Sequence, residues 1–143
     1  MQTGLGKQGN AIGKLPWTGA FGDLVGYEFQ ELDGDRWAVS LDLSDHHLNQ
    51  YGIAHGGVPL TLLDVAGGGA VYRLGLAVSR IATISMSTNF IGGAGSGRLV
   101  ATGCVDGHGQ TIAHTSMQLY QGDLNGSLLA TAQGSYRLFL KRE

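Results

Sequence analysis

The chain has 143 residues, which fits one compact domain. Hydrophobic residues make up 43% of it and charged residues only 14%, so we expect a substantial core and burial of further apolar surface by self-association. The net charge of −2 argues against a nucleic-acid-binding protein, and the single cysteine, Cys104, excludes an internal disulfide and a cysteine-based metal cluster. We find neither a signal peptide nor a run of about 18 apolar residues, and therefore expect a cytoplasmic protein without a membrane segment.

Weak periodicity in residues 1–16 predicts only a short helix or an arm. Val25 to Leu32 is expected to form a strand, and Asp33-Gly34-Asp35 to form the turn that follows it. Arg36 to Leu43 alternates apolar and polar residues, which is typical of a half-buried strand. The two segments therefore predict a β-hairpin.

The long helix of the chain is predicted from Gly57 to about Leu74. Pro59 falls in its first turn, where a missing N–H is tolerated. The triplet Gly67-Gly68-Gly69 disfavours a helix by about 1 kcal/mol per residue relative to alanine, so tertiary packing must support it. We interpret the helix as a central element whose backbone a sheet approaches closely.

Four further strands follow the helix and are separated by glycine-containing turns. Their predicted ranges are Ile81–Phe90, Arg98–Asp106, Thr111–Tyr120 and Leu128–Leu140. This spacing suggests an antiparallel meander. Two strands, one long helix and four strands predict an α+β architecture with a helix on one face of a sheet.

The segment from His47 to Asp64 carries the strongest functional signal. Gly56 and Gly57 stand at the expected helix start, where unpaired amides and a partial positive charge could bind a carbonyl oxygen or an oxyanion. By itself, however, His55-Gly56-Gly57 is also the pattern of an ordinary tight turn from a loop into a helix.

Asp64 is an acid between two apolar residues of this helix, where an ionised carboxylate is costly to desolvate without partners. It is either a catalytic carboxylate or an acid on the exposed edge of the helix. The eight residues that separate it from Gly56 span about 12 Å of helix, whereas both groups must lie about 3 Å from one reacting atom. Two antiparallel copies could satisfy this requirement, so we expect an active site between subunits.

Three other residues are candidates for the same site. Asn49 could hydrogen-bond a carbonyl or a water, or form an Asx turn. His55 is interpreted as orienting the loop through a backbone hydrogen bond in preference to transferring protons. Thr83 could position a water near Asp64, although threonine is also an ordinary strand residue.

These residues, in this order, resemble the hot-dog-fold acyl-CoA thioesterases, in particular the PaaI-like branch. The matching pattern is Asn49, His55 six residues later, Gly56-Gly57, and Asp64 nine residues after the histidine. The resemblance implies an antiparallel sheet wrapped around the helix, and a homodimer with a continuous sheet that often pairs into a tetramer. It also implies that Asp64 is nucleophile or general base, that the Gly56 amide polarises the thioester, and that Asn49 and His55 support the loop.

The resemblance extends to a hydroxyl at Thr83 and departs from the family at Gly92-Gly93, where relatives often carry a bulkier residue and proline. That departure concerns the shape of the acyl pocket and the rigidity of the loop. Arg98 and Arg137, together with Lys141 and Arg142, are candidates for binding the phosphates of coenzyme A, which is part of the substrate.

No cofactor or metal is expected, because His46, His108 and His114 show no metal-ligand spacing. The glycine-rich segment before Arg98 lacks the Gly-Lys-Ser/Thr ending of a phosphate loop. The leading hypothesis is an acyl-CoA or aryl-CoA thioesterase. The alternatives are a non-catalytic acyl-CoA-binding or regulatory hot-dog module, and a hydratase on the same fold.

Overall fold

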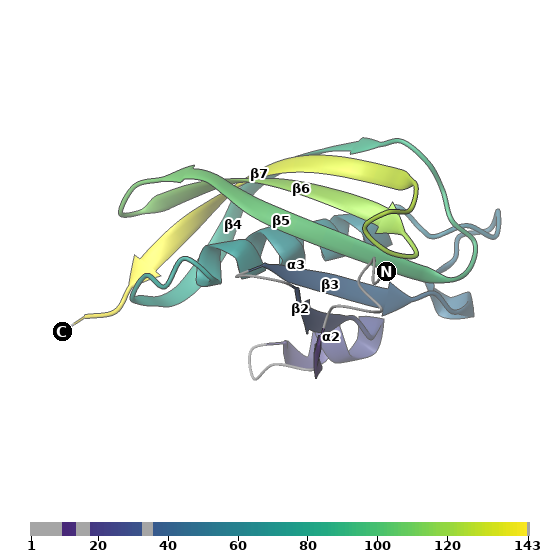
Figure 1. The fold of residues 1–143 in the computed structure, drawn as a ribbon, viewed down its shortest axis with the longest axis horizontal. Coiled ribbons are helices and arrows are strands. Elements are labelled where there is room, and N and C mark those ends of the chain that lie inside the picture. Colours follow the sequence, from purple (N-terminus) through teal and green to yellow (C-terminus); the bar gives the residue numbers. More distant parts are fainter. Residues whose placement is uncertain (1–9, 14–17, 33–35, 143) are drawn as a thin grey trace.

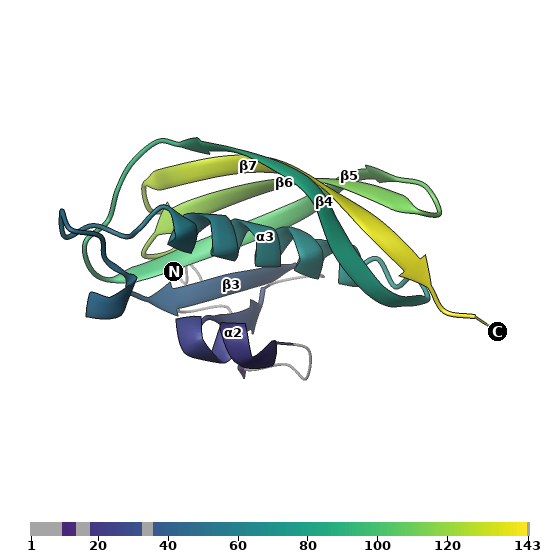
Figure 2. The ribbon, with the colours of Figure 1, turned by 180° about the vertical axis from the view of Figure 1, so that it is seen from behind.

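The computed structural model describes residues 10–13, 18–32 and 36–142. A seven-stranded antiparallel sheet curves around helix α3, which lies lengthwise along its concave face (Figures 1 and 2). The strands are β1 (Asn10–Gly13), β2 (Glu28–Glu31), β3 (Trp37–Asp42), β4 (Val78–Phe90), β5 (Arg98–His108), β6 (Ile112–Gln121) and β7 (Leu128–Leu140). The helices are α2 (Gly19–Val25), α3 (Gly57–Tyr72) and the short 3-10 helix η1 (Asp45–His47). This arrangement confirms the predicted α+β architecture.

The order of the strands in the sheet differs from the predicted meander. The order is β1-β2-β3-β5-β6-β7-β4, so β5, β6 and β7 form a meander but β4 lies at the far edge, beside β7. Helix α3 crosses the concave face and carries the chain from β3 to the opposite edge, where β4 begins (Figure 2). One side of the 13-residue strand β4 therefore has no neighbouring strand within the described residues.

The glycines of α3 allow the sheet to approach the helix backbone, as predicted. A Cβ atom at Gly67 would collide with the hydroxyl of Tyr136 on β7. On the opposing side, a Cβ atom at Gly103 of β5 would lie 2.5 Å from the carbonyl oxygen of Ala66. The core is formed by apolar side chains of α3 and of the concave face, among them the fully buried Leu62, Leu63, Leu99, Met117 and Leu119.

The N-terminal part shows the largest departures from the sequence prediction. Helix α2 was not predicted, because its seven residues include two glycines and are too few to show a helical periodicity of apolar residues. It ends at Gly26, whose φ of 90° is in the left-handed region that favours glycine. The strand expected from Val25 therefore begins only at Glu28. Of the expected arm, Asn10–Gly13 forms β1, whereas the rest of it and the Asp33–Asp35 turn lie outside the described residues.

Within the described residues, no helix is both long enough and apolar enough to cross a membrane.

Candidate active site

The carboxylate of Asp64 is held by two hydroxyl groups from the sheet. Thr83 on β4 donates to Oδ1 at 2.7 Å. Tyr136 on β7 donates to the main-chain carbonyl oxygen of Asp64 at 2.9 Å and to the same Oδ1 at 3.1 Å. Within the described residues, Oδ2 accepts no hydrogen bond. One oxygen is therefore fixed by donors, and the other is available to a substrate or a water.

Asp64 lines a pocket of about 240 Å³ between α3 and the sheet, whose aromatic walls include Tyr27, Phe29 and Tyr72. Burial is the main cause that raises the pKa of Tyr136, followed by the charge of Asp64 and the hydrogen bond to it. Burial and the same charge also raise the pKa of Tyr27. Both phenols therefore keep their protons and remain hydrogen-bond donors at neutral pH.

The start of α3 forms a second, separate group. The amide of Gly57 donates to Nδ1 of His55 at 2.9 Å, which is a backbone hydrogen bond of the kind considered for a histidine that orients the loop. Because this nitrogen accepts a hydrogen bond, the ring is in the form that carries its proton on Nε2. Gly57, which was predicted to bind substrate, thus has its amide already engaged. The amide of Gly56 has no acceptor within the described part of the chain, and it is the free donor at this helix start.

Asn49 closes the loop that precedes α3. Its Oδ1 accepts hydrogen bonds from the amides of Tyr51 at 2.9 Å and Ile53 at 3.3 Å, which is the Asx-turn alternative considered above. The side-chain nitrogen has no acceptor within the described residues and remains a donor. Asn49 and Gly56 line one pocket of about 380 Å³, together with the aromatic ring of Phe90.

Asp64 and Gly56 lie in different pockets of the protomer, and these two pockets share no lining residue. This separation agrees with the estimate from helix length that one helix cannot present both groups to one reacting atom. The chain therefore carries two half-sites, which we call the Asp64 half-site (Asp64, Thr83, Tyr136) and the Gly56 half-site (Gly56, Asn49).

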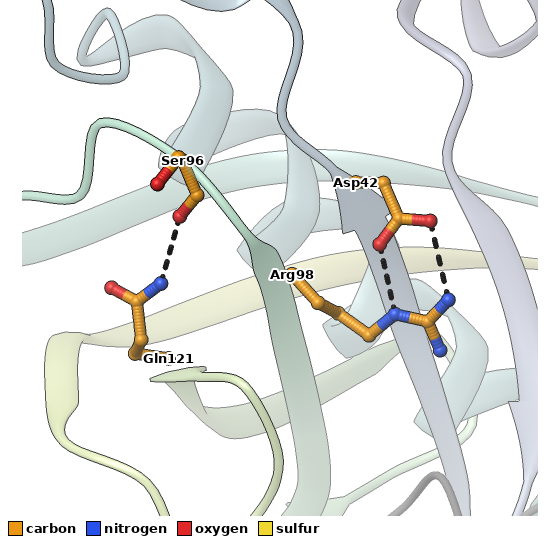
Figure 3. A network of polar contacts seen from close by, with 4 residues as sticks. All are labelled: Asp42, Ser96, Arg98 and Gln121. Carbon is orange, nitrogen blue, oxygen red and sulfur yellow. Dashed lines mark hydrogen bonds and ion pairs between the residues drawn. The ribbon is translucent and has the colours of Figure 1, made fainter.

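Arg98 belongs to neither half-site. Its Nε and Nη2 donate to Oδ1 and Oδ2 of Asp42 at 3.0 and 3.2 Å, and the neighbouring Gln121 donates to the carbonyl oxygen of Ser96 (Figure 3). The hydrogen bond to Arg98 is the main cause that lowers the pKa of Asp42, and the same bond raises the pKa of Arg98. The charge of Arg98 is thus already compensated within the protein.

Arg137 has a different environment. Its guanidinium lies 5.0 Å from the centre of the Phe139 ring, and the guanidinium of Arg80 lies 3.9 Å from the centre of the same ring. Neither arginine has a carboxylate partner within the described residues. Arg80 was not singled out by sequence, because only the pairing of β4 with β7 places it opposite Phe139.

Sequence reasoning also missed Tyr136 and Tyr27 near Asp64. No local pattern identifies either residue, because Tyr136 is placed by the register of β7 in the sheet and Tyr27 lies in the short connection between α2 and β2. Among the described residues, no group of His, Cys, Asp or Glu side chains is arranged to hold a metal ion.

Comparisons with known proteins identify the family and the fold. A family model described as the thioesterase superfamily matches residues 51–127. The chain is 33% identical over 118 residues to a candidate esterase of Pseudomonas aeruginosa, PA0474, covering 81% of this chain and 86% of that protein.

Solved structures show the same fold. The Bacillus halodurans protein BH2602, solved with CoA, has a TM-score of 0.79 at 22% identity, over 90% of this chain and 83% of that one. The Escherichia coli PaaI protein of the phenylacetic acid degradation operon has a TM-score of 0.73 at 20% identity, over 85% of both chains. The comparisons support thioester hydrolysis as the general activity. This chain belongs to the thioesterase superfamily and has its hot-dog fold.

Proposed function

We propose that this protein is an acyl-CoA thioesterase, which hydrolyses acyl-CoA with water to a free acid and CoA. The observation that carries the proposal is the carboxylate of Asp64, which lines a pocket, has one oxygen held by Thr83 and Tyr136, and has a second oxygen without a hydrogen bond from any described residue. A carboxylate fixed in this way can attack a thioester carbonyl or take a proton from the attacking water.

The Gly56 amide is the proposed donor to the thioester carbonyl oxygen. It lies at the N-terminus of α3, where the helix dipole adds a partial positive charge and stabilises developing negative charge. Asn49 lines the same pocket, and its side-chain nitrogen is proposed as a second donor. The ring of His55 holds the turn and takes no part in proton transfer.

A second copy of the chain would unite the two half-sites. The free edge of β4 is long enough to pair with the same strand of a partner, and Thr83 and Phe90 lie at different points along it. Phe90 packs beside Gly56, whereas Thr83 contacts Asp64. Antiparallel pairing about an axis midway between Thr83 and Phe90 brings the Asp64 half-site of one protomer toward the Gly56 half-site of the other. We therefore propose a homodimer with two shared sites, which can pair further into a tetramer.

CoA is proposed as the thiol carrier, and no cofactor is needed beyond water as co-substrate. The relative BH2602 was solved with CoA. In this chain, the guanidinium groups of Arg80 and Arg137 lie against the ring of Phe139 and have no carboxylate partner within the described residues. Arg137 thus keeps its proposed role toward the CoA phosphates, whereas Arg98 is engaged with Asp42.

A thiol-release assay across short, medium and aromatic acyl-CoAs tests the proposal. We expect catalytic release of CoA from at least one class of substrate. Binding of acyl-CoA without turnover would instead support the non-catalytic module. A single-turnover reaction in ¹⁸O-water then separates the two routes. Label in Asp64 indicates a covalent anhydride that water cleaves at the aspartyl carbonyl, whereas general-base catalysis places the label only in the product acid.

A further inference from the structure

The pocket of the Gly56 half-site extends from an exposed rim into the hydrophobic core. At the rim, Phe90 and Ile91 are exposed beside Gly56. At the inner end, the walls are the buried side chains of Leu99 and Leu119. The pocket of about 380 Å³ is therefore lined mainly by apolar residues, and Asn49 and Gly56 are also among its lining residues.

Two glycines keep this pocket open. A Cβ atom at Gly93 would lie 3.2 Å from Cδ1 of Ile53, and one at Gly92 would lie 3.4 Å from Cδ2 of Leu129. Neither glycine has a positive φ, so the backbone conformation does not demand glycine at these positions. The two glycines leave space in the pocket, because any larger side chain at these positions would project against the pocket walls.

We propose that this pocket binds the apolar chain of the acyl group, and that Gly92 and Gly93 set the largest acyl group that the enzyme accepts. The proposal rests on the proposed function, in which the Gly56 amide holds the thioester carbonyl at the pocket mouth. Of the two substituents of that carbonyl, only the acyl chain suits apolar walls, because the amides and phosphates of CoA are costly to remove from water.

The volume indicates the class of acyl group. A cavity of about 150 Å³ accommodates benzene, and this pocket has more than twice that volume. It therefore accepts groups larger than a single ring, and the apolar lining favours a flexible aliphatic chain. The inferred substrates are medium-chain aliphatic acyl-CoAs.

The test uses S-alkyl-CoA thioethers of increasing chain length, which bind without being hydrolysed. Isothermal titration of the wild-type protein should show affinity rising roughly fourfold for each added methylene until the pocket is full. Gly93→Val should bind the shortest thioether as the wild type does but reach its plateau at a shorter chain, because valine fills the pocket beside Ile53. Adding Ile53→Ala to Gly93→Val should restore the longer chains.

Gly109→Val is the matched control, since a Cβ atom at Gly109 has no atom within 4 Å and this glycine lines none of the pockets described above. Circular dichroism confirms that each variant is folded. Affinity that does not depend on chain length in the wild type, or the same plateau in wild type and Gly93→Val, would overturn the inference. A chain-length-dependent affinity without any thiol release would leave the pocket intact and refute the hydrolase instead.

Discussion

The hydroxyl of Tyr136 occupies the space that a side chain at Gly67 would need. From there it donates both to the main-chain carbonyl and to the carboxylate of Asp64, one turn earlier on α3. A glycine in the middle of a helix is unfavourable by itself. Here it admits a donor from the sheet to the helix that carries Asp64.

Substitution of Gly67 and of Gly69 by alanine should therefore change the stability of the protein in opposite directions. Gly67→Ala is expected to destabilise the protein by about 1–3 kcal/mol, because its methyl group collides with Tyr136. Gly69→Ala meets Trp37 at an ordinary 3.5 Å and should stabilise it by up to about 1 kcal/mol through helix propensity. Urea denaturation measures both. Equal effects would contradict the assigned packing.

Removal of the Tyr136 hydroxyl should affect turnover more than binding. Tyr136→Phe loses a hydrogen bond to a charged group, which is worth about 1.5–3 kcal/mol and corresponds to roughly a 10- to 100-fold fall in kcat. KM should change little, because the phenol reaches Asp64 and not the acyl-binding pocket. Steady-state kinetics provide the measurement, with Tyr120→Phe as a control outside both pockets. A change in KM alone would argue against this positioning role.

Asp64→Asn should keep the fold and lose most of kcat. The amide has nearly the same shape and can still accept hydrogen bonds from Thr83 and Tyr136, but it is neither a base nor a comparable nucleophile. Thiol release and thermal unfolding, measured on the same preparation, separate chemistry from stability. Hydrolysis near the wild-type rate would remove Asp64 from the mechanism.

The two half-sites can be inactivated separately and then recombined. Gly56→Pro removes the free amide at a φ of −53° that proline adopts, whereas Gly56→Ala keeps the amide and has room beside Phe90. We expect the alanine variant to stay active and the proline variant to be inactive.

Mixing Gly56→Pro with Asp64→Asn subunits should restore activity, because a heterodimer contains one intact pair of half-sites. Subunit exchange is verified by mass spectrometry of the native dimer. Verified exchange without recovered activity would contradict the shared site.

The Asp42–Arg98 ion pair should contribute little to stability, and in a pH-dependent way. The side chain of Asp42 is 72% exposed, so solvent screening limits the pair to less than about 1 kcal/mol. Because the folded-state pKa of Asp42 is lowered, this contribution is present at neutral pH and is lost as the pH falls through that pKa. Asp42→Asn should thus differ from the wild type at pH 7 and converge with it once the pH has fallen below that lowered pKa. A difference that persists there would have another origin.

Much of the secondary structure was predictable, because residue alternation marks Arg36–Leu43 as a strand and Gly57–Tyr72 is mostly apolar over four turns. The expectation that this strand is half-buried was wrong, since Ala38 to Leu41 of β3 are buried on both faces. The residues of the two half-sites could be chosen as candidates from the sequence, since an acid and a pair of glycines stand out in such a helix, but their roles stay predictions. The order of the strands in the sheet was not predictable, because the position of β4 depends on pairing between Val78 and Leu140, which are far apart in the chain. Tyr136 and Arg80 could not be assigned for the same reason.

The three consecutive glycines of α3 affect the stage of folding at which Asp64 acquires its hydrogen-bond partners. Such a helix is unstable in isolation. The sheet that supports it forms only when residues far apart in the sequence pair, such as Ala38 with Thr102. Asp64 meets Thr83 and Tyr136 only when that sheet is complete. A partly folded chain lacks these contacts, so the proposed chemistry requires the completely folded protein.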